Sequence, residues 1–179
     1  SFGYGSLKIQ GKAVLGVRPL LTILVEDPHA EYRLVHDKEF YQKKLFEDDF
    51  SIRNYFLATS QGRFTFQNGG IIGPFREPDG RDGEENLHLM KFSVREAVRQ
   101  GFDFSIYDAN RDGTVDSSEL VILNVDNGSN YWGATRYPGC LKPEGSKVRI
   151  CVGFAAIGAK SSFGTWAHEL AHTVGAADM

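Results

Sequence analysis

The sequence predicts an α/β domain, with a mixed, twisted sheet and helices packed against it. Three observations favour this class. Short apolar runs alternate along the chain with segments of helical spacing. The sequence shows no internal repeat and no low-complexity segment. Its 179 residues are enough for one domain with its own core and too few for two.

The first half of the chain predicts two strands and two helices, separated by turn residues. The apolar run at 20–26 predicts a buried strand, which Asp27 and Pro28 end. Ser51 is a suitable N-cap for a helix that Gly62 ends. In order, we expect a strand at 20–26, a helix at 36–47, a helix at 51–62, a strand at 63–67 and a loop rich in Gly, Pro and Asp at 68–83.

The second half predicts two further helices and at least two further strands. Gly101 ends the first of these helices, and an acidic loop follows it. Apolar runs of strand length then mark the two strands. In order, we expect a helix at 84–100, a strand at 119–126, irregular structure at 127–146, a strand or strand pair at 147–157 and a helix at about 161–174.

The composition is that of an ordinary globular protein. Hydrophobic residues make up 41% and charged residues 24%, and the formal net charge is −3. No basic stripe favours a nucleic-acid partner. The longest apolar runs have the length of a strand, so we expect no transmembrane segment. We expect a monomer.

The two cysteines, Cys140 and Cys151, flank a loop that contains Pro143 and Gly145. This segment can fold back as a hairpin and bring the two Cβ atoms together, which favours a disulfide in an exported protein. The alternative is a pair of free thiols in a reducing compartment. Two cysteines alone cannot complete a structural zinc site, which needs four ligands.

The segment HELAHTVGAADM at 168–179 carries the strongest chemical signal. Apolar residues at spacings of three and four give the preceding helix one buried stripe, and His168 and His172 lie beside it. Side chains at i and i+4 project in nearly the same direction, so both imidazoles can reach one metal ion. Glu169 points about 100° away around the helix, where it can activate a water molecule instead of binding the metal.

A catalytic zinc needs a third protein ligand and one open position. Gly175 lies just after the helix and can adopt the left-handed conformation that reverses the chain. The reversal can bring Asp178 back, so His168, His172 and Asp178 are the expected zinc ligands. The alternative is that the HExxH pattern arises by chance on an ordinary helix surface.

The segment DANRDGTVDSSE at 108–119 fits the spacing of a calcium-binding loop. A single loop followed by a strand favours a static calcium clamp over a sensor, which needs paired helices that open. The alternative is an acidic turn that binds no metal. The expected oxygen donors are the side chains of Asp108, Asn110, Asp112, Asp116 and Glu119 and the backbone carbonyl of Thr114.

The pattern HExxHxxGxxD resembles the extended zinc motif of metzincins, with aspartate in place of the usual third histidine. Three other segments narrow the resemblance to the immune inhibitor A family of secreted bacterial metalloproteases. The resemblance covers most of residues 18–179. The segments are RPLLTILVEDP at 18–28, SIRNYFLATSQGRFTF at 51–66 and DANRDGTVDSSELVILNVDNG at 108–128.

The resemblance implies a secreted, extracellular zinc endopeptidase, often with structural calcium. It assigns His168, His172 and Asp178 as ligands and Glu169 as the general base. One feature departs from the family pattern. Metzincins place a methionine turn well beyond the third ligand, and Met179 is too close to be that residue. We therefore expect a single metalloprotease catalytic domain, 1–179, without its C-terminal subdomain.

Three functions remain open at this stage. The first is a zinc endopeptidase that binds an extended peptide along an edge strand, for which 147–157 is the candidate. The second is a catalytically incomplete or non-catalytic metal-binding module that recognises proteins. The third is a calcium-dependent structural or regulatory domain. The intact Glu169 favours the first over the second.

Overall fold

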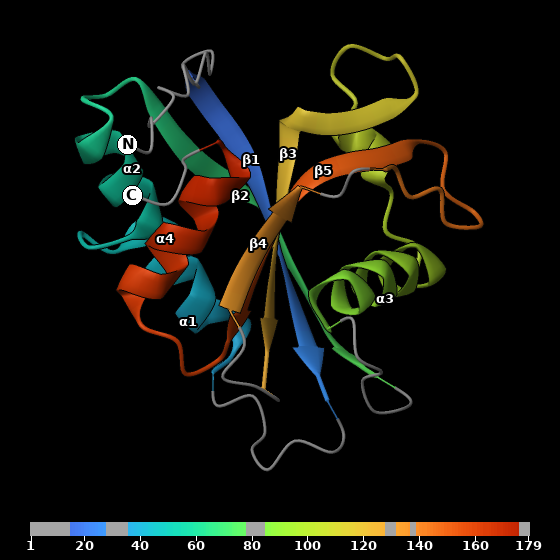
Figure 1. Cartoon of the computed structure of the whole chain (residues 1–179), viewed down its shortest axis with the longest axis horizontal. Coiled ribbons are helices and arrows are strands. Elements are labelled where there is room, and N and C mark those ends of the chain that lie inside the picture. Colours follow the sequence, from blue (N-terminus) through green and yellow to red (C-terminus); the bar gives the residue numbers. More distant parts are fainter. Residues whose placement is uncertain (1–14, 28–35, 78–84, 128–131, 137–138, 176–179) are drawn as a thin grey trace, which may run out of the picture.

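The computed structural model describes residues 15–27, 36–77, 85–127, 132–136 and 139–175. This part of the chain contains five strands and four α-helices, arranged as a sheet with helices on both faces (Figure 1). Their order is β1 (Gly16–Glu26), α1 (Lys38–Gln42), α2 (Ile52–Thr59), β2 (Phe64–Arg76), α3 (Glu85–Arg99), β3 (Thr114–Asp126), β4 (Trp132–Arg136), β5 (Arg149–Gly158) and α4 (Phe163–Thr173). A π-helical turn, Lys43–Glu47, continues α1, and a 3₁₀ turn, Phe104–Tyr107, precedes β3.

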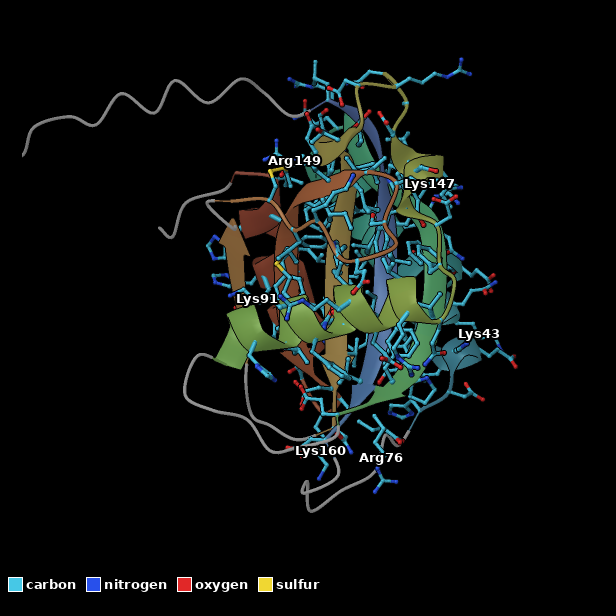
Figure 2. All side chains as sticks on the ribbon, turned by 90° about the vertical axis from the view of Figure 1, so that its right-hand side faces the viewer. Lys43, Arg76, Lys91, Lys147, Arg149 and Lys160 are labelled. Atoms are coloured by element: carbon cyan, nitrogen blue, oxygen red, sulfur yellow. A yellow bond between two sulfur atoms is a disulfide. The ribbon has the colours of Figure 1, made fainter. Side chains whose placement is uncertain are left out.

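The strands form one mixed sheet in the order β2-β1-β3-β5-β4. The first four strands are parallel, and β4 runs antiparallel to β5 at the edge. Arg76, the last residue of β2, and Lys160, two residues after β5, lie at the same end of the molecule (Figure 2). The predicted α/β class, with a mixed sheet and packed helices, is confirmed at this level.

Helix α3 covers one face of the sheet, and α1, α2 and α4 cover the other (Figure 1). A hydrophobic cluster lies on each face. Alternate residues of β3 divide between them, because successive side chains of a strand point to opposite faces. Leu120 and Ile122 pack with α3 on one face. Val121, Leu123 and Val125 pack with α1, α2 and α4 on the other face.

Serine side chains cap the first turns of α2 and α4, and the cap at Ser51 was predicted. The Ser51 hydroxyl accepts a hydrogen bond from the backbone N–H of Asn54, at 3.3 Å, and α2 starts at the next residue. The Ser162 hydroxyl accepts one from the N–H of Thr165, at 3.2 Å, and α4 starts at Phe163. Each hydroxyl satisfies a donor that the helix itself cannot pair.

Two loop predictions are wrong in part. Residues 68–76 are strand, because β2 continues beside β1 through two register irregularities and the Gly73–Pro74 peptide. Within 127–146, residues 132–136 form β4. Composition favoured loops at both places, and pairing with a neighbouring strand outweighed it.

The prediction that 147–157 forms an edge strand is also wrong. The segment 147–157 does form β5, but β5 lies between β3 and β4. The sheet edge beside α4 is therefore β4, whose residues Trp132 to Arg136 pair with Ile157 to Gly153.

Candidate metal centre on helix α4

Helix α4 lies against the sheet through its apolar stripe. Trp166, Ala167 and Leu170 are buried in the cluster between this helix and the sheet. The helix packs against β5, β4 and α2 (Figure 1). This packing fixes the orientation of the helix, so it also fixes the direction in which the adjacent histidines project.

The two histidines meet on the side of α4 beside this stripe. The Nε2 atoms of His168 and His172 are 3.0 Å apart, and their ring centroids are 4.5 Å apart with nearly perpendicular planes. Two nitrogen ligands of a tetrahedral zinc ion, each at about 2.0–2.1 Å, lie about 3.4 Å from one another. The pair therefore matches two zinc ligands to within a few tenths of an ångström.

Glu169 differs from the neighbouring His168 in its surroundings. Only 4% of Glu169 is exposed, whereas His168 is exposed. Removing a carboxyl group from water costs free energy, and glutamates are almost never fully buried without a partner or a role. A buried glutamate beside a histidine pair is consistent with the general base expected from the sequence.

The chain turns after α4 where the sequence predicts a turn. The N–H of Gly175 donates to the carbonyl oxygen of His172 at 3.0 Å, and Gly175 has a φ of 101°, a left-handed conformation. The expected third ligand, Asp178, lies outside the described residues. Within the described ranges, no three His, Cys, Asp or Glu side chains are grouped so that they could hold one metal ion.

The acidic loop before β3 folds around its own backbone N–H groups. The carboxylate of Asp108 accepts from the N–H of Asp112 at 3.1 Å and from the N–H of Gly113 at 3.0 Å. The side-chain oxygen of Asn110 also accepts from the backbone N–H of Asp112, and the carboxylate of Asp112 accepts from the N–H of Thr114 at 2.8 Å. The first half of the predicted calcium loop thus has its oxygens turned towards the loop interior.

Glu119, the last residue of that loop, reaches back across it. Its Oε1 accepts from the N–H groups of Ala109 and Asn110, at 2.9 and 3.2 Å, and its Oε2 accepts from the N–H of Asp116 at 3.2 Å. The Asp116 carboxylate accepts from Ser118. The donor set contains only oxygens, which suits Ca²⁺.

Two side chains fasten this loop to the sheet. The Tyr107 hydroxyl donates to the carbonyl of Gly69 in β2, and burial raises the pKa of Tyr107 to about 12. The Arg18 guanidinium, from β1, donates to the carbonyl of Ser117. Burial lowers the pKa of Arg18, while the nearby carboxylate of Asp116 acts in the opposite direction. The loop is therefore held at both ends.

The two cysteines are joined. Cys140 and Cys151 form a disulfide with their Cα atoms 4.4 Å apart. The hairpin between them is closed by reciprocal backbone hydrogen bonds between Leu141 and Ile150, both 2.8 Å long. Lys147 in this hairpin forms an ion pair with Asp103, which lies between α3 and the 3₁₀ turn.

Strand β4, at the sheet edge next to α4, is an element that the sequence analysis missed. It has only five residues and lies within a segment rich in Gly, Asn and Pro. The aromatic and β-branched residues in YWGATRY were the available signal. The strand packs against α4, which places a sheet edge beside the helix that carries the histidine pair.

The fold and the site thus define a mixed α/β protein with a histidine pair on its last described helix. No protein-family model matches the chain, and no curated protein matches it either. None of the described helices combines the length and apolar character needed to cross a membrane. The function must therefore be inferred from the residues themselves.

Proposed function

We propose that this chain carries the catalytic residues of a metzincin-like zinc endopeptidase. One observation carries the proposal: the Nε2 atoms of His168 and His172, one helical turn apart, meet at 3.0 Å beside the buried Glu169. The resemblance of HExxHxxGxxD and of three other segments to the immune inhibitor A family supports the same conclusion.

His168, His172 and Asp178 would hold the zinc ion. Bound zinc supplies a Lewis acid that polarises the scissile carbonyl and lowers the pKa of water. Glu169 takes a proton from the attacking water and later delivers it to the leaving amine. Its position one residue after His168 keeps it beside the ion without making it a ligand.

Strand β4 is the surface we propose for the substrate. An extended peptide can add to a sheet edge by main-chain hydrogen bonds, with little dependence on its side chains. β4 forms the edge next to α4, and it contacts that helix. A peptide paired with β4 would lie alongside the histidine pair. The substrates are therefore proteins or peptides in an extended conformation.

The loop at 108–119 would hold one structural calcium ion. Its carboxylates already lie within the loop, and Tyr107 and Arg18 fasten it to the sheet. Calcium would neutralise the negative charge of Asp108, Asp112 and Glu119, three carboxylates of one short loop. The disulfide between Cys140 and Cys151 supports secretion into an oxidising, extracellular environment.

The test is metal content followed by a peptidase assay. The purified chain is dialysed against metal-free buffer, loaded with zinc, dialysed again and measured by plasma mass spectrometry. We expect about one zinc ion per chain, and cleavage of fluorogenic peptides that stops on dialysis with a chelator. Zinc without any cleavage would support the non-catalytic binding module. Absence of zinc would contradict the proposal.

A further inference from the structure

Gly153, in β5, lies directly beneath the C-terminal end of α4. Its neighbours Ala155 and Ile157 belong to the cluster under α4, while Phe154 and Ala156 belong to the opposite cluster. Alternation along the strand therefore directs position 153 towards α4. A Cβ atom added to Gly153 would lie 3.0 Å from the carbonyl oxygen of Thr173 and 3.3 Å from the Cβ of Thr173.

Thr173 is the last residue of α4, and it follows His172 directly. Thr173 is buried, and its hydroxyl donates to the carbonyl of Leu170 at 2.7 Å. Because the closest atom to the added Cβ belongs to the backbone, it cannot move aside as a flexible side chain would. A side chain at position 153 therefore requires the last turn of α4 and β5 to separate by a few tenths of an ångström.

The other end of α4 is held independently. Ser162 caps the helix, and Trp166 is buried against the sheet cluster. A push at Thr173 would therefore move the His172 end of the helix relative to the sheet, together with the turn at Gly175. Metal ligands must be held within about 0.5 Å of their working positions.

We propose that Gly153 is a positioning residue for the metal centre. This inference rests on the proposed zinc site and adds to it. Because Gly153 has no side chain, the helical turn that carries His172 can pack closely against β5. Ala155, the next residue of β5 on the same face, is also small and lies in the cluster under α4.

The experiment compares Gly153→Ala with two matched glycine variants of the full chain. In Gly164→Ala, on the same helix, the new Cβ meets only the Ser162 hydroxyl, at 3.7 Å. In Gly69→Ala, the new Cβ meets the Leu20 backbone at 3.0–3.1 Å, which is equally tight but lies in the β1–β2 pair. Each variant is titrated with Co²⁺, and both the affinity and the visible ligand-field spectrum are recorded.

We expect Gly153→Ala to lose about 10–100-fold in cobalt affinity and to change the spectrum, as outer-shell metal-site variants do. Gly164→Ala should match the wild type, and Gly69→Ala should lose thermal stability without losing affinity. Wild-type affinity and spectrum in Gly153→Ala would overturn the inference while leaving the proposed function intact. Failure of the wild type to bind cobalt would instead reject the proposed function, and the inference with it.

A second variant covers the case in which Gly153→Ala does not fold. The double variant Gly153→Ala/Thr173→Gly withdraws the Thr173 side chain from the new methyl group, and Thr173→Gly alone is its control. Weaker cobalt binding in the double variant than in Thr173→Gly supports the positioning role. Equal binding in the two would overturn it.

Discussion

The imidazole of His172 stands nearly perpendicular to that of His168, with the two Nε2 atoms 3.0 Å apart. The rings reach this arrangement from adjacent turns of one helix that is anchored to the sheet by Trp166 and Leu170. The packing of α4 therefore places both imidazoles on one side of the helix.

Replacing either histidine should remove zinc without unfolding the protein. His168 is exposed, so His168→Ala should change the free energy of unfolding of the metal-free protein by no more than about 0.5 kcal/mol. Zinc content after dialysis should fall from about one ion per chain to near zero. His88→Ala, at an exposed histidine of α3, is the control and should retain zinc. Full zinc content in His168→Ala would argue against the site.

Glu169→Gln should separate catalysis from metal binding. The amide has nearly the volume of the carboxyl group, so the buried position stays filled, but it cannot accept the proton of water. We expect unchanged zinc content and a loss in kcat/KM of about 10²–10⁴-fold. Glu144→Gln, at an exposed glutamate of the disulfide-closed hairpin, should keep full activity. Comparable turnover in Glu169→Gln and the wild type would reject Glu169 as the base.

Calcium should stabilise the wild type through the loop at 108–119. With zinc saturating and free calcium at 100 times its Kd, the expected gain is about 2.7 kcal/mol in the free energy of unfolding. Thermal melts in calcium and in EGTA would measure it. Glu119→Gln should remove the difference, because Glu119 closes the loop. Identical wild-type melts under both conditions would show that the loop binds no calcium.

The lowered pKa of Asp103 predicts that the stability of the fold falls at low pH. The hydrogen bond from Lys147, helped by those from Ser105, lowers the pKa of the Asp103 carboxyl to about 2. A carboxyl group with a lowered pKa in the folded state stabilises the fold above its unfolded pKa of about 3.9, and this contribution disappears as the pH falls towards 2. The melting temperature of Asp103→Asn should therefore be lower than that of the wild type at pH 7. Near pH 2 the two melting temperatures should be equal.

The control for this comparison is Asp49→Asn, at an exposed aspartate just before α2. Its melting temperature should follow that of the wild type at every pH. A constant gap between Asp103→Asn and the wild type from pH 7 to pH 2 would show that the ion pair with Lys147 does not cause the effect.

The elements with strong local signals were predictable from the sequence. Ser51 caps α2, and residues 20–25 of the predicted strand are buried in β1. The HExxH spacing likewise predicts a histidine pair on one helix face. In each case the information lies within a few neighbouring residues, in capping groups or in hydrophobic periodicity.

The features that could not be predicted depend on distant pairing. β2 continues through Gly69 and Gly70 because β1 lies beside it, and β4 exists because β5 offers an edge. The close contact between Gly153 and Thr173 joins β5 to the end of α4, and the distance between these two segments depends on all the residues that pack between them. Neither composition nor periodicity encodes such partners.

The two edges of the sheet differ in their capacity to accept another strand. β2 carries Pro74, which has no N–H to donate, and its register breaks twice against β1. Lateral addition of a strand is thereby directed to the β4 edge, beside the histidine pair. Two copies that associate through their sheets would therefore cover the surface proposed for the substrate. At high protein concentration, a second copy paired with β4 should compete with the substrate and lower the activity per molecule.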